Sequence, residues 1–159
     1  MRFNVKTIIF ALVLIAGVAA LALSLSTGVM AVSASNAQHG QLHVTKECSQ
    51  YHGLAGQFCT ITSSNLGEIK VGSTVFYDQN AGIPAGLLDS NVVLDAGNGN
   101  RALGRCTLEL ATGLGLCTFS DGTGQFAGFQ ARVDVSPPKS AKDNWHWEGT
   151  YDFNPLPQR

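Results

Sequence analysis

The sequence has little charge, and its charges form no cluster of one sign. Asp, Glu, Lys and Arg make up 13% of the chain. Two of the ten basic residues, Arg2 and Lys6, lie in the N-terminal segment, so the chain from Ser35 onward has eight basic and eleven acidic residues, a formal net charge of −3. Without a basic patch, neither nucleic acid nor an anionic membrane surface is expected as a partner.

Several patterns that carry chemistry are also missing. The histidines are scattered without the spacing of metal ligands, so no metal site and no cofactor are expected (His39, His43, His52, His146). No nucleophile-elbow motif is present. The glycine-rich segment after Asp121 leads into a strand pattern and not a helix, which argues against nucleotide binding. No stretch shows sustained helical periodicity, which favours an all-β fold.

Residues 1–34 have the order of a secretory signal peptide. Arg2 and Lys6 precede an uncharged apolar run from Ile8 to Leu25, and small residues then offer cleavage sites between Ala34 and Ala37. An uncleaved membrane anchor is the alternative, because the run is long enough to span a bilayer. Since no positive charge follows closely to stop transfer, we expect cleavage, a secreted or extracytoplasmic protein, and no stable membrane span after cleavage.

All four cysteines lie beyond this segment, and each of two pairs encloses ten residues. In an exported protein, disulfides are the default. More than one connectivity is allowed, and we favour Cys48–Cys59 with Cys106–Cys117, because both enclosed segments carry glycines where the chain would fold back. A zinc site is the less favoured alternative, since it needs closer ligand pairs.

Short alternating apolar and polar runs, separated by turn residues, fill the rest of the chain. The clearest are Leu42–Cys48, Ile69–Tyr77, Phe129–Val135 and Trp145–Phe153. In the second run, the apolar side is shared by Ile69, Val71, Val75 and Tyr77. Period two with one apolar face is typical of half-buried antiparallel strands. Seven or eight such runs at a spacing of about 10 to 14 residues suit a sandwich or a closed barrel.

Two segments resemble a known family. The segment LGEIKVGSTVFYD (Leu66–Asp78) resembles an early strand of plant allene oxide cyclases. The segment FSDGTGQFAGFQARVDV (Phe119–Val135) resembles the glycine-rich strand–turn–strand of allene oxide cyclases and dirigent proteins, with Asp121 where that pattern has a glycine. Together they cover about a quarter of the mature chain. The resemblance implies a calycin-like, eight-stranded antiparallel barrel with a mostly apolar cavity, often assembled as a homotrimer.

This resemblance sets the expected domain organisation. After the signal peptide, residues 35–41 are expected to be a short tail, residues 42–154 the barrel, and residues 155–159 a C-terminal tail.

The resemblance also implies catalytic candidates. Tyr77 matches the family's tyrosine, Thr74 stands where the family has a polar Asn that holds a water, and Glu47 is the nearest candidate for the carboxylate. Two of these have a simpler interpretation: Tyr77 as a core residue and Glu47 as a solvated strand end. Asp78, beside Tyr77, is expected to cap a turn.

Aromatic residues are the candidates for lining a ligand pocket: Phe76, Phe126, Phe129, Trp145, Trp147 and Tyr151. The size of the tryptophans favours a register with Trp145, Trp147 and Tyr151 inward. The reversed register would instead place His146 and Glu148 inside as an acid–base pair.

The expected function is binding of a small hydrophobic molecule and steering of its cyclisation or stereoselective coupling, as an isomerase of the cyclase type or a dirigent-type protein. Whether the chain turns over a substrate is left open. The alternative is a non-catalytic carrier or a cell-surface interaction domain on the same scaffold, with its barrel filled by side chains.

Overall fold

The computed structural model describes residues 38–82, 85–138 and 144–154. The chain divides into two units, 1–34 and 35–159, and every described residue lies in the second. The predicted signal peptide, its cleavage site and the predicted tail at 155–159 therefore lie outside the described residues. Within the described ranges, no helix has the length and apolar character needed to cross a membrane.

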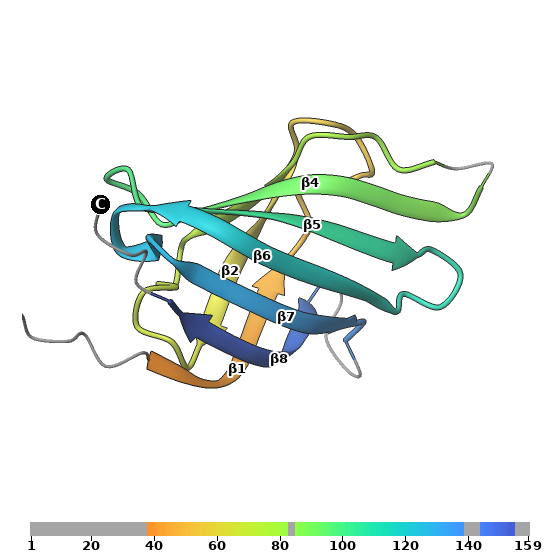
Figure 1. The fold of residues 1–159 in the computed structure, drawn as a ribbon. Coiled ribbons are helices and arrows are strands. Elements are labelled where there is room, and N and C mark those ends of the chain that lie inside the picture. The colour runs from red at the N-terminus through yellow and green to blue at the C-terminus, as the bar shows by residue number, and fades with distance from the viewer. Residues whose placement is uncertain (1–37, 83–84, 139–143, 155–159) are drawn as a thin grey trace, which may run out of the picture. The chain divides into compact units, whose positions relative to one another are not determined.

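Eight antiparallel strands close into a barrel in chain order, as Figure 1 shows. They are β1 (Gln38–Glu47), β2 (Phe58–Ser64), β3 (Thr74–Tyr77), β4 (Leu87–Asp95), β5 (Arg101–Glu109), β6 (Gly115–Thr123), β7 (Phe129–Ser136) and β8 (Asn144–Phe153), with a 3₁₀ turn η1 (Gly124–Phe126) after β6. Pairing of β1 with β8, from Gln38 opposite Phe153 to Glu47 opposite Asn144, closes the barrel. The predicted all-β class and eight-stranded antiparallel barrel are confirmed.

Strand β7 shows how the alternation builds the interior. Phe129, Ala131, Val133 and Val135 are buried, whereas the residues between them are exposed. Successive side chains of a strand point to opposite faces, so one face of each strand fills the barrel and the other meets solvent.

Two boundaries differ from the sequence-based expectation. Strand β1 begins at Gln38, so residues 38–41, predicted as part of a tail, pair with β8. These residues are polar and show no apolar alternation, and their pairing with β8 depends on closure of the barrel. Strand β3 has only four residues, and Val71 is 71% exposed because the chain turns at Gly72 before β3 begins.

Aromatic rings fill the half of the barrel that lies toward η1. Phe129 packs against Phe126, Phe119 and Phe153 with ring centroids 5.3, 6.1 and 5.1 Å apart, and Phe119 lies 5.5 Å from Trp147. We call this part the η1 half. Gly128 lets the chain turn there, since its φ is +77° and a Cβ would lie 2.0 Å from the Asn154 carbonyl oxygen.

Candidate functional site

The opposite end of the barrel, which we call the mouth, contains a cavity of about 150 Å³. Strands β1, β3, β5 and β7 end there, and β2, β4, β6 and β8 begin there. The wall combines four cysteines, apolar side chains and a few side chains with polar groups: Lys46, Cys48, Tyr51, Cys59, Tyr77, Leu88, Cys106, Thr107, Leu108, Cys117, Val135 and Trp145. A concave, mostly apolar site with few polar groups is typical of a small-molecule site.

Lys46 is the unusual residue of this cavity. It follows Leu42 and Val44 on the inward side of β1, and it is only 2% exposed. Its Nζ donates a hydrogen bond to Tyr77 Oη at 2.5 Å. The same nitrogen lies 4.6 Å from the centroid of the Trp147 ring and 5.2 Å from that of Tyr77. Lysines are almost never fully buried unless they are paired with an acid.

No carboxylate pairs with Lys46 in the described part of the chain. The ion pairs found there are His43–Glu148, Arg101–Asp95 and Arg105–Asp89. Burial without a counter-charge disfavours the ammonium form, and this desolvation lowers the pKa of the Lys46 amine to about 7. The cavity therefore contains an amine that is partly neutral at physiological pH.

The two tyrosines beside the amine are protonated at neutral pH. Burial, with the neighbouring Tyr51, raises the pKa of the Tyr77 phenol. Burial likewise raises the pKa of Tyr51, whose ring centroid lies 4.4 Å from that of Tyr77. The Tyr51 hydroxyl oxygen is buried and has no hydrogen-bond partner within the described ranges. A buried hydroxyl without a partner is costly in a closed core and useful where a ligand supplies the partner.

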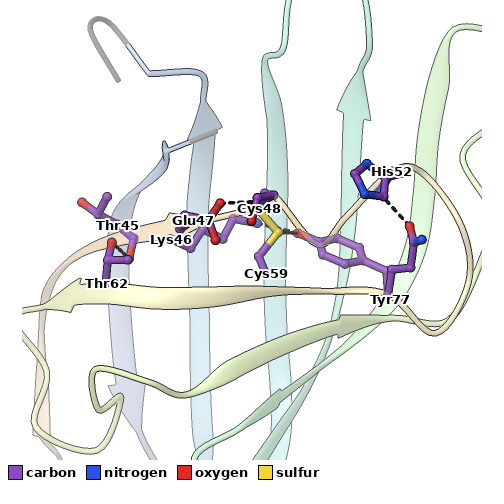
Figure 2. The surroundings of a disulfide bond; sticks show 10 residues. Thr45, Lys46, Glu47, Cys48, His52, Cys59, Thr62 and Tyr77 are labelled. Atoms are coloured by element: carbon purple, nitrogen blue, oxygen red, sulfur yellow. Dashed lines mark hydrogen bonds between the residues drawn. A yellow bond between two sulfur atoms is a disulfide. The ribbon is translucent and has the colours of Figure 1, made fainter. Parts of the chain in front are cut away.

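Two disulfides form part of the wall. Cys48–Cys59 and Cys106–Cys117 are bonded, as predicted, and all four residues are buried. Cys106 and Cys117 lie directly opposite each other on β5 and β6. In Figure 2 the Tyr77 hydroxyl points toward the other disulfide, with its oxygen 4.0 Å from Cys59 Sγ. The disulfides therefore hold the strand ends that shape the mouth.

The three predicted catalytic residues are not brought together. Tyr77 lies in the cavity. Glu47 follows Lys46 on β1, and its Oε1 accepts a hydrogen bond from the Ser49 backbone N–H at 2.6 Å. Thr74 is a partly exposed residue at the start of β3, and neither it nor Glu47 lines the cavity. Alternation explains the position of Glu47: Lys46 points into the barrel, so the next residue of β1 faces outward.

The aromatic residues predicted to line a pocket also lie in different parts of the barrel. Trp145 lines the cavity, and Trp147 is fully buried over the Lys46 amine. Phe126 and Phe129 fill the η1 half instead. The other two lie elsewhere: Tyr151 is half-buried and packs over Gly40, and Phe76 is 37% exposed beside Phe58 on the outer face. Phe76 cannot share the interior with Tyr77, because adjacent strand residues face opposite sides.

Strand β8 has the register that places the tryptophans inward. Glu148 is exposed and pairs with His43 on the outer face, and the His146 ring lies 3.4 Å from the Thr45 hydroxyl. An internal His146–Glu148 acid–base pair is therefore not formed.

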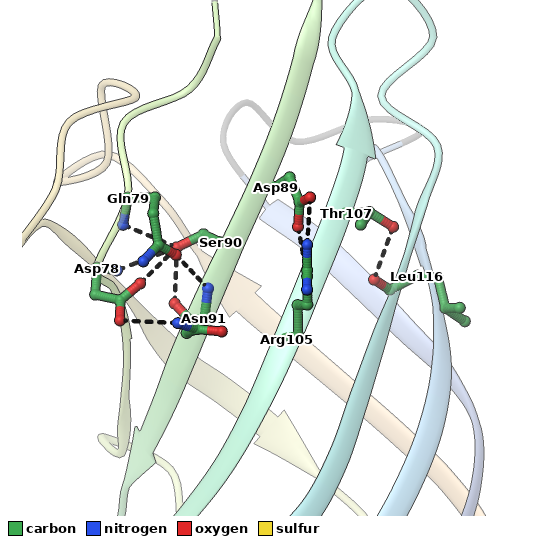
Figure 3. A network of polar contacts seen from close by, with 8 residues as sticks. All are labelled: Asp78, Gln79, Asp89, Ser90, Asn91, Arg105, Thr107 and Leu116. Atoms are coloured by element: carbon green, nitrogen blue, oxygen red, sulfur yellow. Dashed lines mark hydrogen bonds and ion pairs between the residues drawn. The ribbon is translucent and has the colours of Figure 1, made fainter.

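Polar contacts between β3 and β4 have a structural role (Figure 3). The buried Ser90 hydroxyl donates to the Asn91 carbonyl and accepts from the backbone N–H groups of Asp78 and Gln79. On the neighbouring strands, Arg105 donates two hydrogen bonds to the Asp89 carboxylate. The Ser90 contacts hold the turn after β3, and the Arg105–Asp89 contact joins β5 to β4. In the described ranges no cluster of His, Cys, Asp or Glu is arranged to hold a metal ion.

Lys46 is the residue that sequence reasoning missed. The signal was its position, since Leu42, Val44, Lys46 and Cys48 share one parity of the first alternating run. A lysine on the apolar side of a strand is an exception to the pattern, and such exceptions are expected at functional sites.

No protein-family model matches the chain, and neither a curated protein nor a solved structure matches it. The resemblance to allene oxide cyclases and dirigent proteins thus rests on the two segments alone. A barrel is a scaffold for many functions, so function has to be argued from the cavity and its residues.

Proposed function

We propose that the chain is exported and that its barrel binds a small, mostly apolar molecule at the mouth, with one oxygen atom of the ligand against Lys46 and Tyr77. The observation that carries this proposal is the cavity of about 150 Å³ with the buried Lys46 amine in its wall, which pairs with no carboxylate of the described residues. The two buried disulfides support export, because such bonds persist in oxidising compartments.

The cavity volume limits the size of the ligand. An engineered apolar cavity of about 150 Å³ holds one benzene molecule, whereas drug-sized ligands occupy about 300 to 1,000 Å³. A ligand with a single ring fits the enclosed space, and a long-chain fatty-acid derivative would have to extend out through the mouth.

The polar groups orient the ligand. An oxygen atom of the ligand can accept from the Lys46 amine beside Tyr77, or from the Tyr51 hydroxyl, which has no partner among the described residues. A few polar groups in an apolar wall fix orientation without adding much affinity. Such a site suits steering of a cyclisation or a stereoselective coupling, in which the protein mainly holds one conformation of a reactive molecule. The proposal therefore includes a dirigent-type or cyclase-type activity and the homotrimer that the resemblance implies.

A carrier or cell-surface interaction domain is the second candidate function. It is favoured by the η1 half, where the aromatic cluster around Phe129 fills the interior with side chains. A carrier would bind the same ligand and release it unchanged.

Calorimetric titration with toluene and benzyl alcohol tests ligand binding. The protein is secreted from the full-length chain and kept oxidised. We expect one ligand per barrel, and Leu88→Phe, which fills the cavity, should abolish binding. Leu103→Phe adds the same group at an exposed position of β5 and should leave binding unchanged. Absence of binding to the parent protein, or equal loss in both variants, would contradict the proposal. Native mass spectrometry of the same sample reports the number of subunits.

A further inference from the structure

We propose that the Lys46 amine is a nucleophile that forms a Schiff base with a small aldehyde or ketone in the cavity. This inference rests on the proposed ligand site and names its substrate class, a compact carbonyl compound with an apolar body.

The geometry of the amine carries the inference. Lys46 Nζ lies in the cavity wall, and its neighbours are the Tyr77 hydroxyl and the faces of two aromatic rings. No acid of the described ranges pairs with it. A lysine that served only to neutralise a buried charge would have a carboxylate partner, and a lysine that served only solubility would reach solvent.

The surroundings keep the amine reactive. Apart from Lys46, the titratable groups that line the cavity are Tyr51 and Tyr77, because all four cysteines there are oxidised. Desolvation lowers the pKa of Lys46 to about 7. About half of these amines are then neutral at pH 7, compared with roughly one in 2,500 for a solvated lysine. Desolvation in an apolar pocket is a known way to activate a lysine.

The reaction needs no oxidant or reductant. The nitrogen lone pair forms a bond to the carbonyl carbon, and the carbonyl π electrons move to oxygen, which receives a proton from the nitrogen. The carbinolamine then loses its C–O bond, and the oxygen leaves with a second proton as water while C=N forms. The Tyr77 hydroxyl, 2.5 Å from Nζ, is placed to relay protons between nitrogen and oxygen. The products are one imine and one water.

Reductive trapping with benzaldehyde and sodium cyanoborohydride tests the inference. We expect one benzyl group per chain, located by peptide mapping at Lys46. At pH 7 it should form at least about tenfold faster than at Lys70, which is exposed and serves as the internal control. The rate at Lys46 should reach half its maximum near pH 7, and Tyr77→Phe should slow trapping severalfold. Lys46→Met should abolish the site-specific label, and a cooperative thermal unfolding transition shows that the variant is folded.

The outcomes separate this inference from the proposed function. If toluene and benzaldehyde bind but Lys46 is labelled no faster than Lys70, the Schiff base is wrong and the ligand site stands. If neither compound binds and no label accumulates at Lys46, both proposals are wrong.

Discussion

At the η1 half, the interior of the barrel is filled by aromatic rings, whereas at the mouth it contains a cavity, two disulfides and a buried amine. The same eight strands build both ends, so the difference comes from the side chains alone. Packed rings stabilise the fold, while an unfilled volume and a buried lysine with no acid partner among the described residues destabilise it. The comparison suggests that the η1 half supplies the stability on which a functional but unfavourable mouth depends.

The largest change in stability is expected when a buried aromatic side chain of the η1 half is truncated. Phe129 is fully buried against three other phenylalanine rings, so Phe129→Ala should lower the free energy of unfolding by about 3 to 5 kcal/mol. Phe76→Ala, the same change on the outer face, should cost less than about 1 kcal/mol. Unfolding in guanidinium chloride measures both. Equal losses would show that the two faces of the barrel do not differ as described.

Removal of the buried Lys46 amine should stabilise the protein instead. Lys46→Met should raise the free energy of unfolding at pH 7 by about 2 to 4 kcal/mol, because the ammonium no longer has to be desolvated. In the parent protein the folded pKa is about 7 and the unfolded value is 10.5. Both states bind the proton below pH 7, so the penalty is fully present there.

Between these two pKa values the unfolded state binds one more proton than the folded state. The stability of the parent protein should therefore rise with pH above 7, by up to about 1.4 kcal/mol per pH unit from this group. Lys46→Met should lack this slope, and Lys70→Met, at an exposed position, should keep it. Denaturant unfolding at a series of pH values measures the slope. A destabilised Lys46→Met variant without a change in slope would contradict the assignment.

The two disulfides provide a comparison within the mouth. Each joins cysteines 11 positions apart, so loss of either pair by double Cys→Ala substitution should cost about 2.5 to 3 kcal/mol by loop entropy. Loss of Cys48–Cys59 should also weaken toluene binding more than loss of Cys106–Cys117 does, because Tyr77 contacts the Cys48–Cys59 bond. Thermal unfolding and calorimetry measure the two effects. Binding that depends equally on both pairs would mean that Tyr77 is not held by its neighbouring disulfide.

The smallest effect is expected on the outer face of β8. Glu148→Gln removes an exposed pair with His43 and should change stability by less than about 1 kcal/mol, with toluene binding unchanged. Denaturant unfolding and calorimetry of the single variant are sufficient. Loss of binding would indicate that Glu148 reaches the interior, as in the reversed register of β8.

The barrel was predictable because its signals are local. The alternation of Phe129 to Val135 and of Trp145 to Phe153 identifies strands with one buried face. The glycines between the cysteines of each pair indicate the disulfides that the structure contains. The extension of β1 to Gln38 was not predictable, because those residues pair only through closure with β8.

The site was harder to predict because it depends on which half of the barrel each inward residue reaches. Tyr77 and Trp145 were identified, yet Phe126 and Phe129, also inward, lie in the other half. Glu47 was preferred as the carboxylate because of a resemblance, whereas parity alone pointed to Lys46 beside it. The inward side of a strand can be predicted from its sequence, but a cavity is a space left by several strands together.

The pKa of Lys46 decides whether the mouth contains an amine that is neutral at physiological pH, on which both the ligand site and the Schiff base depend. Lysine labelled with ¹³C at Cε, observed by NMR across a pH titration, reports each amine, and Lys46→Met assigns the signal. We expect Lys46 to titrate near pH 7 and its signal to move when benzyl alcohol is added. If the pKa of Lys46 keeps its ordinary value of 10.5 and its signal does not respond to the ligand, the assignment of a neutralisable amine to the mouth is wrong.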